Sequence, residues 1–218
     1  MIVLEQKPLD QILEYINDVG SLLVVGCDGC SGIYQVGGEK QAKTMKKLLE
    51  MGMKIKGKKA IKIEATTVLR QCDLRITATT IRPLTKEFDT FLSLACGIGV
   101  QTIAKAFPDK LVIPGTDTKF LGMQERELGE FAEMCRACGD CVLYETGGIC
   151  PIARCAKSLL NGPCGGMVDG KCEVGDYTRD CAWYLIYEAL KRQGRLDLYK
   201  KFRPPRDWSY KAQPQEIK

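Results

Sequence analysis

The amino-terminal half of the chain contains apolar residues in two kinds of pattern, one typical of helices and the other typical of strands. Apolar residues at helical spacing, or runs rich in helix formers, predict helices at residues 9–16, 39–51 and 100–107. Short apolar or β-branched runs predict strands at residues 21–25, 61–68, 91–95 and 111–113. Because these strands alternate with helices, the pattern predicts an α/β fold with an open, mostly parallel sheet.

The segments before and after the last predicted strands have less regular patterns. Residues 73–90 read either as a strand or as a helix that Pro83 breaks, but a further parallel strand requires a crossover helix before it. After the last strand, residues 115–123 read as a linker, and a helix is expected from about Gln124. We therefore expect an α/β domain at residues 1–118, a small irregular or helical cysteine-rich domain at 119–202 and an extended tail at 203–218.

The carboxyl-terminal part contains one strong helical pattern and a proline-containing tail. Asp180 can cap a helix that Gly194 ends, and its apolar stripe is Trp183, Ile186, Tyr187 and Leu190. The tail reads as an arm that docks on a partner, or as a segment that folds back on its own domain. Its candidate contacts are Arg203, Arg206, Trp208 and Tyr210.

Cysteine is concentrated in one stretch, which holds eight of the twelve cysteines. These eight are Cys135, Cys138, Cys141, Cys150, Cys155, Cys164, Cys172 and Cys181. They begin with a C-x2-C-x2-C run and continue to a Cys-Pro pair, spacings that let consecutive thiolates surround one metal centre. Eight thiolates suffice for two four-ligand centres, and the absence of histidine leaves all-cysteine centres. Iron–sulfur clusters are favoured; zinc bound by four cysteines and a disulfide framework are the alternatives.

The other four cysteines are Cys27, Cys30, Cys72 and Cys96, and each follows the end of a predicted strand. Because parallel strands have their carboxyl ends at one edge, where ligands bind in open α/β sheets, we expect these four to converge on a third four-thiolate centre. The alternative is that some are buried core cysteines. Nearby glycines complete neither a dinucleotide-binding motif nor a P-loop.

Charge and hydropathy exclude several classes of protein. No apolar run is long enough to cross a bilayer, and the net charge of +5 is mild. The lysine-rich segment 40–59 lacks interleaved aromatic residues, so it reads as a solvated face rather than a nucleic-acid surface. The first residues do not resemble an export leader. We therefore expect a cytoplasmic protein that binds neither nucleic acid nor membrane.

The motifs also resemble a known family. The stretch CRACGDCVLYETGGICPIARCAKSLLNGPCGG is similar to the cysteine-rich accessory subunit of acetogen-type methylenetetrahydrofolate reductase, in the family termed methylenetetrahydrofolate reductase C-terminal-like. GKCEV, DCAWYLIYE and GRLDLYKKFRPPRDWS extend the resemblance. The segments GCDGC, VGGEKQ, RQCD and LACGIGVQT resemble the amino-terminal domain of that subunit.

This resemblance implies a role in one-carbon metabolism of anaerobes. The family's accessory subunit is regarded as the iron–sulfur partner of a separate, flavin-bearing catalytic subunit, so the resemblance implies 4Fe–4S clusters, two in the carboxyl-terminal domain and one in the amino-terminal domain. We expect an electron-transfer subunit, not catalytic alone, whose partners are the catalytic subunit and further electron-transfer subunits. The alternatives are a zinc-stabilised structural adaptor of the same complex and a nucleic-acid-binding zinc protein.

Overall fold

The chain folds into two compact units. The computed structural model describes residues 1–125, 127–209 and 214–215. The amino-terminal unit comprises Met1–Ala132 and the carboxyl-terminal unit Glu133–Lys218. In the described part of the chain, no helix has the length and apolar character needed to cross a membrane.

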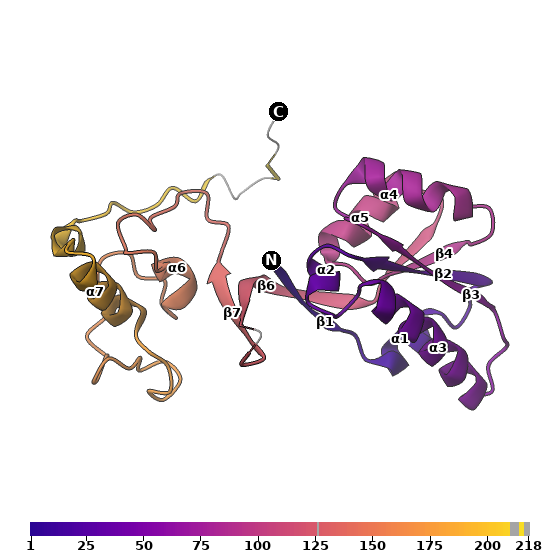
Figure 1. The fold of residues 1–218 in the computed structure, drawn as a ribbon, viewed down its shortest axis with the longest axis horizontal. Helices are drawn as coiled ribbons and strands as arrows, with labels where there is room; N and C mark the ends of the chain where they lie inside the picture. The colour runs from indigo at the N-terminus through magenta and orange to yellow at the C-terminus, as the bar shows by residue number, and fades with distance from the viewer. Residues whose placement is uncertain (126, 210–213, 216–218) are drawn as a thin grey trace. The chain divides into compact units, whose positions relative to one another are not determined.

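A four-stranded parallel sheet forms the centre of the amino-terminal unit (Figure 1). Its strands, in spatial order, are β3 (Lys62–Val68), β2 (Ser21–Cys27), β4 (Thr90–Ser93) and β5 (Leu111–Pro114). The predicted open parallel α/β sheet is confirmed. The chain runs from β2 to β3 on one side and returns to β4 on the other, so a topological switch point lies between β2 and β4.

Helices cover both faces of this sheet. α1 (Leu9–Tyr15) and α3 (Glu39–Ile55) contribute to one hydrophobic core, and α4 (Leu74–Ile81) and α5 (Gly97–Ala106) contribute to the other. The short helices α2 (Cys30–Ile33) and η1 (Arg82–Leu84) lie in the connections. The ambiguous segment after residue 73 is therefore the crossover helix α4.

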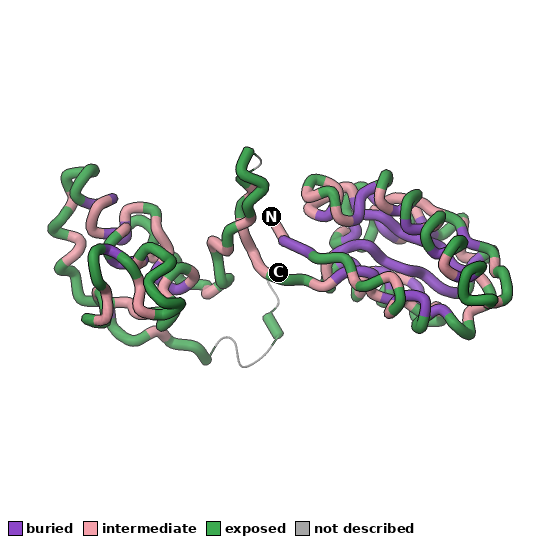
Figure 2. The backbone as a smooth tube through the Cα atoms, turned by 90° about the horizontal axis from the view of Figure 1, so that it is seen from below, coloured by how far each residue is buried: buried purple, intermediate pink, exposed green. Residues whose placement is uncertain are grey.

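Alternation along β2 explains why its sequence is apolar throughout. Leu22 and Val24 belong to the core on the α1 and α3 face, whereas Leu23 and Val25 belong to the core on the α4 and α5 face. All four are almost fully buried. Figure 2 shows buried segments that run through the interior of this unit. A parallel strand covered on both faces needs an apolar side chain at every position.

A second, three-stranded sheet has the order β1-β6-β7, with bounds Ile2–Gln6, Thr116–Glu125 and Glu130–Cys135. The helix expected from about Gln124 is wrong, because β6 pairs antiparallel with β1, and Ile2 lies opposite Leu121. The predicted domain boundary after residue 118 falls inside β6. This pairing keeps β6 in the amino-terminal unit, and the division between the units follows Ala132.

The carboxyl-terminal unit contains little regular structure. It has α6 (Pro151–Arg154), α7 (Ala182–Arg192) and the 3-10 helix η2 (Leu196–Lys200). The predicted helix at α7 is confirmed, and its core consists of Trp183, Ile186 and Leu190.

The predicted cap of α7 is wrong. Cys181 occupies the N-cap position, and its side chain makes no capping hydrogen bond. The carboxylate of Asp180 instead pairs with the Lys171 ammonium at 2.6 Å. Cys181 is therefore placed directly at the start of the helix, where backbone amides point outward.

Candidate metal centre

Four cysteines line one cavity at the carboxyl edge of the parallel sheet. Cys27 is the last residue of β2, Cys30 the first of α2, and Cys96 precedes α5. Cys72 lies in the connection from β3 to α4. The cavity has a volume of about 370 Å³, and we call it the four-cysteine cavity. The fold thus brings together side chains that are up to 69 positions apart in sequence, at the switch point of the sheet.

The walls of the four-cysteine cavity are largely apolar, with Ile2, Leu4, Ile33 and Ile98 among the lining residues. Cys27 is buried, and this burial raises the pKa of its thiol; hydrogen bonds from the backbone amides of Gln71 and Gly29 oppose the rise. A thiol of this kind releases its proton when a cation binds. The donor set, four thiols and no disulfide, fits the ligand count of an iron–sulfur cluster or of zinc.

A buried glutamine positions the loop that carries Cys72. The Gln71 Nε2 donates to the carbonyl oxygens of Val25 and Gly26 at 2.9 and 2.7 Å. Its Oε1 accepts from the Ser93 hydroxyl at 2.7 Å. Gln71 is fully buried, so its amide ties the Cys72 loop to both β2 and β4. Sequence reasoning missed this residue, because a glutamine beside a cysteine carries no signal of burial.

The loop that follows Cys30 is fastened to the end of β4. The Ser31 hydroxyl donates to the Leu94 carbonyl at 2.5 Å. A side chain at Gly37 would place its Cβ only 1.9 Å from the same oxygen, so only glycine fits there. These two contacts position Cys30 beside the strand that leads to Cys96, and neither was predicted.

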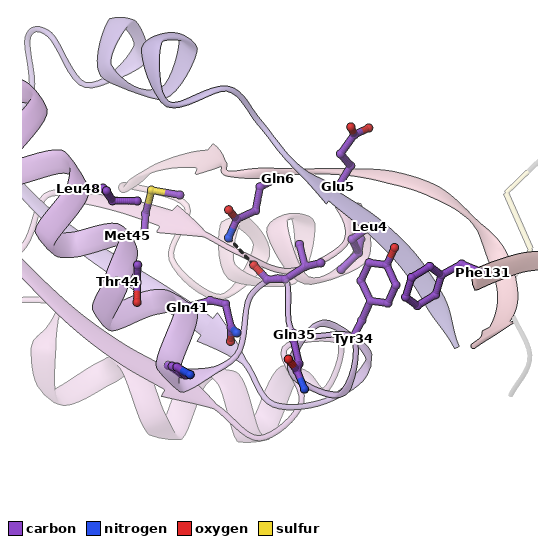
Figure 3. Close-up of a pocket in the computed structure, with 12 residues that line it drawn as sticks. Leu4, Glu5, Gln6, Tyr34, Gln35, Gln41, Thr44, Met45, Leu48 and Phe131 are labelled. Atoms are coloured by element: carbon purple, nitrogen blue, oxygen red, sulfur yellow. Dashed lines mark hydrogen bonds between the residues drawn. The ribbon is translucent and has the colours of Figure 1, made fainter. Parts of the chain in front are cut away.

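A larger hollow of the amino-terminal unit, about 540 Å³, contains no cysteine (Figure 3). Tyr34 and Phe131 form one wall, where their rings meet edge to face with 4.1 Å between centroids. The Gln6 amide donates to the Val36 carbonyl at 2.6 Å inside it. We assign the candidate chemistry to the four-cysteine cavity, because it combines convergent thiols with apolar walls.

The remaining eight cysteines lie in the carboxyl-terminal unit, mostly in irregular segments. Cys135 ends β7, Cys150 and Cys155 flank α6, and Cys181 precedes α7. None of the twelve cysteines of the chain is in a disulfide. Among the described residues, no three cysteine, aspartate or glutamate side chains form a metal-binding group. Which cysteines share a centre, and whether they bind metal, remain predictions.

The start of the C-x2-C-x2-C run has a compact backbone. Ala137 has a left-handed backbone with φ of 48°, and its amide donates to the Cys135 sulfur at 3.3 Å. Backbone N–H groups directed at a ligand sulfur stabilise the negative charge of a metal-bound thiolate. This local geometry suits a metal-binding turn.

The tail folds back on the carboxyl-terminal unit at Arg203. The Arg203 Nε donates to the Glu145 carboxylate at 2.8 Å, and its backbone exchanges two 2.8 Å hydrogen bonds with the Asn161 side chain. Arg203 is only 5% exposed, and the Arg206 side chain is likewise 5% exposed. The proposal that these two arginines contact a partner is therefore wrong; Trp208 is exposed, and Tyr210 lies outside the described residues.

One comparison with known proteins gives a match. Residues 113–209 match a family described as methylene-tetrahydrofolate reductase C terminal. No curated protein and no solved structure matches the chain. The matched range includes the eight cysteines of the carboxyl-terminal unit and supports the link of this chain to methylenetetrahydrofolate reductase.

Replacing Gln71 with alanine is expected to destabilise the amino-terminal unit by about 2 kcal/mol, because two carbonyls and a buried hydroxyl each lose a hydrogen bond. Urea unfolding followed by far-UV circular dichroism measures the loss. Gln101→Ala is the control, since that side chain bonds to the Gly97 carbonyl at the surface. Equal stability of the two variants would contradict the role of Gln71.

Cys72→Ser and Cys96→Ser are each expected to lower the iron content by about four atoms per chain, the content of one cluster, without unfolding the sheet. The strands before these residues have their own buried faces. Iron analysis of anaerobically prepared protein checks this, with exposed Thr79→Ser as control. Unchanged iron in both variants would mean that these two cysteines do not ligate a cluster.

The pKa of the Glu145 carboxyl is lowered, first by its hydrogen bond to Lys201 and also by Arg203. A lowered pKa in the folded state contributes stability above the ordinary carboxyl pKa, and this is lost as the pH falls through the lowered value. Glu145→Gln should therefore destabilise the carboxyl-terminal unit by about 2 kcal/mol at pH 7 and by less at pH 3.

Urea unfolding followed by tryptophan fluorescence measures this effect, because both tryptophans lie in the carboxyl-terminal unit. Exposed Asp197→Asn serves as the control. A loss in Glu145→Gln that is equal at both pH values would show that the charge of Glu145 contributes nothing.

Proposed function

We propose that this chain is the iron–sulfur electron-transfer subunit of a methylenetetrahydrofolate reductase complex, and that it passes electrons to a separate, flavin-bearing catalytic subunit. The convergence of Cys27, Cys30, Cys72 and Cys96 on one cavity carries the proposal. Four thiols from separate loops are the ligand set of an iron–sulfur cluster. The family match of residues 113–209 supports the reductase as the complex concerned.

The residues of the four-cysteine cavity suit a redox centre near the surface. A 4Fe–4S cluster supplies one-electron transfer when it is bound. Buried Cys27 and the aliphatic side chains around it limit access of water, which influences the potential. Cys72 is exposed, so the cavity has one ligand at the protein surface. Electrons can therefore cross the edge of the sheet without an organic substrate entering it.

A zinc-stabilised structural adaptor is the second candidate. The carboxyl-terminal unit has a small hydrophobic core around Trp183, whereas most of its cysteine segment is irregular. In so small a core, metal ligation contributes directly to folding, and zinc does this as well as iron. The two candidates differ in one physical property, because zinc thiolate centres undergo no redox change.

Anaerobic stopped-flow mixing tests the electron-transfer function. The chain, reduced with dithionite and freed of excess reductant, is mixed with the oxidised flavin-bearing subunit. We expect the visible absorption of the chain to return as the flavin becomes reduced. The same subunit stripped of flavin is the control and should leave the chain reduced. Colourless, zinc-loaded protein that still supports reductase activity would overturn this function in favour of the adaptor.

A further inference from the structure

The tail of the carboxyl-terminal unit brings a buried cation to one of the candidate ligands. Arg203 is fixed by Glu145 and Asn161, and Pro204 and Pro205 follow it. Proline has a fixed φ angle, so the two prolines restrict the path from Arg203 to Arg206. The tail therefore presents Arg206 at the C-x2-C-x2-C run in a defined position.

The contacts of Arg206 are centred on this run. Its Nη1 donates to the Cys138 sulfur at 3.1 Å, and its Nη2 donates to the Asp140 carbonyl oxygen. The Asp140 carboxylate is 3.9 Å from Nη1 and 77% exposed. The Arg206 Nε is buried and has no hydrogen-bond partner within the described residues. The guanidinium thus lies nearer to a sulfur than to any oxygen of the neighbouring carboxylate.

A buried guanidinium requires nearby negative charge, since an uncompensated buried cation is strongly destabilising. The Asp140 carboxylate is solvated and at the limit of an ion pair, so it compensates this charge weakly. A metal-bound cysteine is a thiolate and supplies negative charge at the Cys138 sulfur. The positive charge of Arg206 is therefore compensated when Cys138 is a metal-bound thiolate.

We propose that Arg206 is a positioning residue that holds the Cys138 thiolate in the ligand turn and lowers the electron density of the centre that Cys138 ligates. The proposal rests on the proposed function for its redox part. A cation that donates to a ligand sulfur stabilises the reduced form of a cluster, which carries one more negative charge, and so raises its reduction potential. It also retains the metal, because a fixed ligand dissociates less readily.

Three variants test this role in the full-length, metal-loaded protein. Arg206→Gln removes the charge, Arg206→Lys keeps the charge but cannot reproduce the two-nitrogen contact, and exposed Arg192→Gln on α7 is the control. The rate of metal transfer to a chelator is measured for each variant, and tryptophan fluorescence checks that the Trp183 core remains folded. We expect Arg206→Gln to release metal about tenfold faster than wild type. Arg206→Lys should be intermediate, and Arg192→Gln should match wild type.

A redox titration followed by electron paramagnetic resonance gives the second measurement. One cluster should shift to lower potential in Arg206→Gln, with a smaller shift in Arg206→Lys. Folded Arg206 variants with wild-type release rates and wild-type potentials would overturn the proposal while leaving the electron-transfer function standing. A protein that holds only zinc would instead overturn that function. The chelator measurement would then still decide the role of Arg206, because fast release from Arg206→Gln supports it and wild-type release overturns it.

Discussion

Burial of the parallel sheet on both faces is the constraint on which the amino-terminal unit depends. Both neighbours of β2 are parallel to it, and helices cover each face, so all strand carboxyl ends lie at one edge. The reversal of strand order between β2 and β4 opens a crevice at this edge. Cys27 ends β2, and Cys72 and Cys96 lie in the connections that follow β3 and β4. The position of the four-cysteine cavity therefore follows from the topology.

Polar contacts make this edge rigid. The Gln71 amide donates to two β2 carbonyls, and the Ser31 hydroxyl donates to the Leu94 carbonyl. Loss of a hydrogen bond to a buried polar group costs free energy. The carboxyl-terminal unit is built differently: a small core under α7, the fixed tail at Arg203 and the cysteine-rich segments carry its structure.

Much of the sheet and the convergence of four cysteines could be predicted from sequence, because buried parallel strands have an apolar pattern and fix where their ends meet. β1 and the pairing of β6 could not, since a pairing between residues 2 and 121 depends on tertiary contacts rather than on local pattern. The same reason explains the wrong helix at Gln124.

The roles of single polar residues likewise could not be predicted from the sequence. Burial of Gln71 depends on packing across two strands, and burial of Arg203 depends on Glu145, which lies 58 positions earlier. The composition of the tail is typical of an exposed segment, but the ion pair with Glu145 holds Arg203 in a buried position. By contrast, helical spacing relates Trp183, Ile186 and Leu190, so the sequence predicts the core that they form.

The proposed function requires that the twelve cysteines bind iron–sulfur clusters. Iron, acid-labile sulfide and zinc per chain, determined on anaerobically purified protein, test this most directly. Three 4Fe–4S clusters predict about twelve iron and about twelve sulfide atoms per chain, with little zinc. Stoichiometric zinc without iron or sulfide would contradict the claim and leave the chain as a metal-stabilised adaptor.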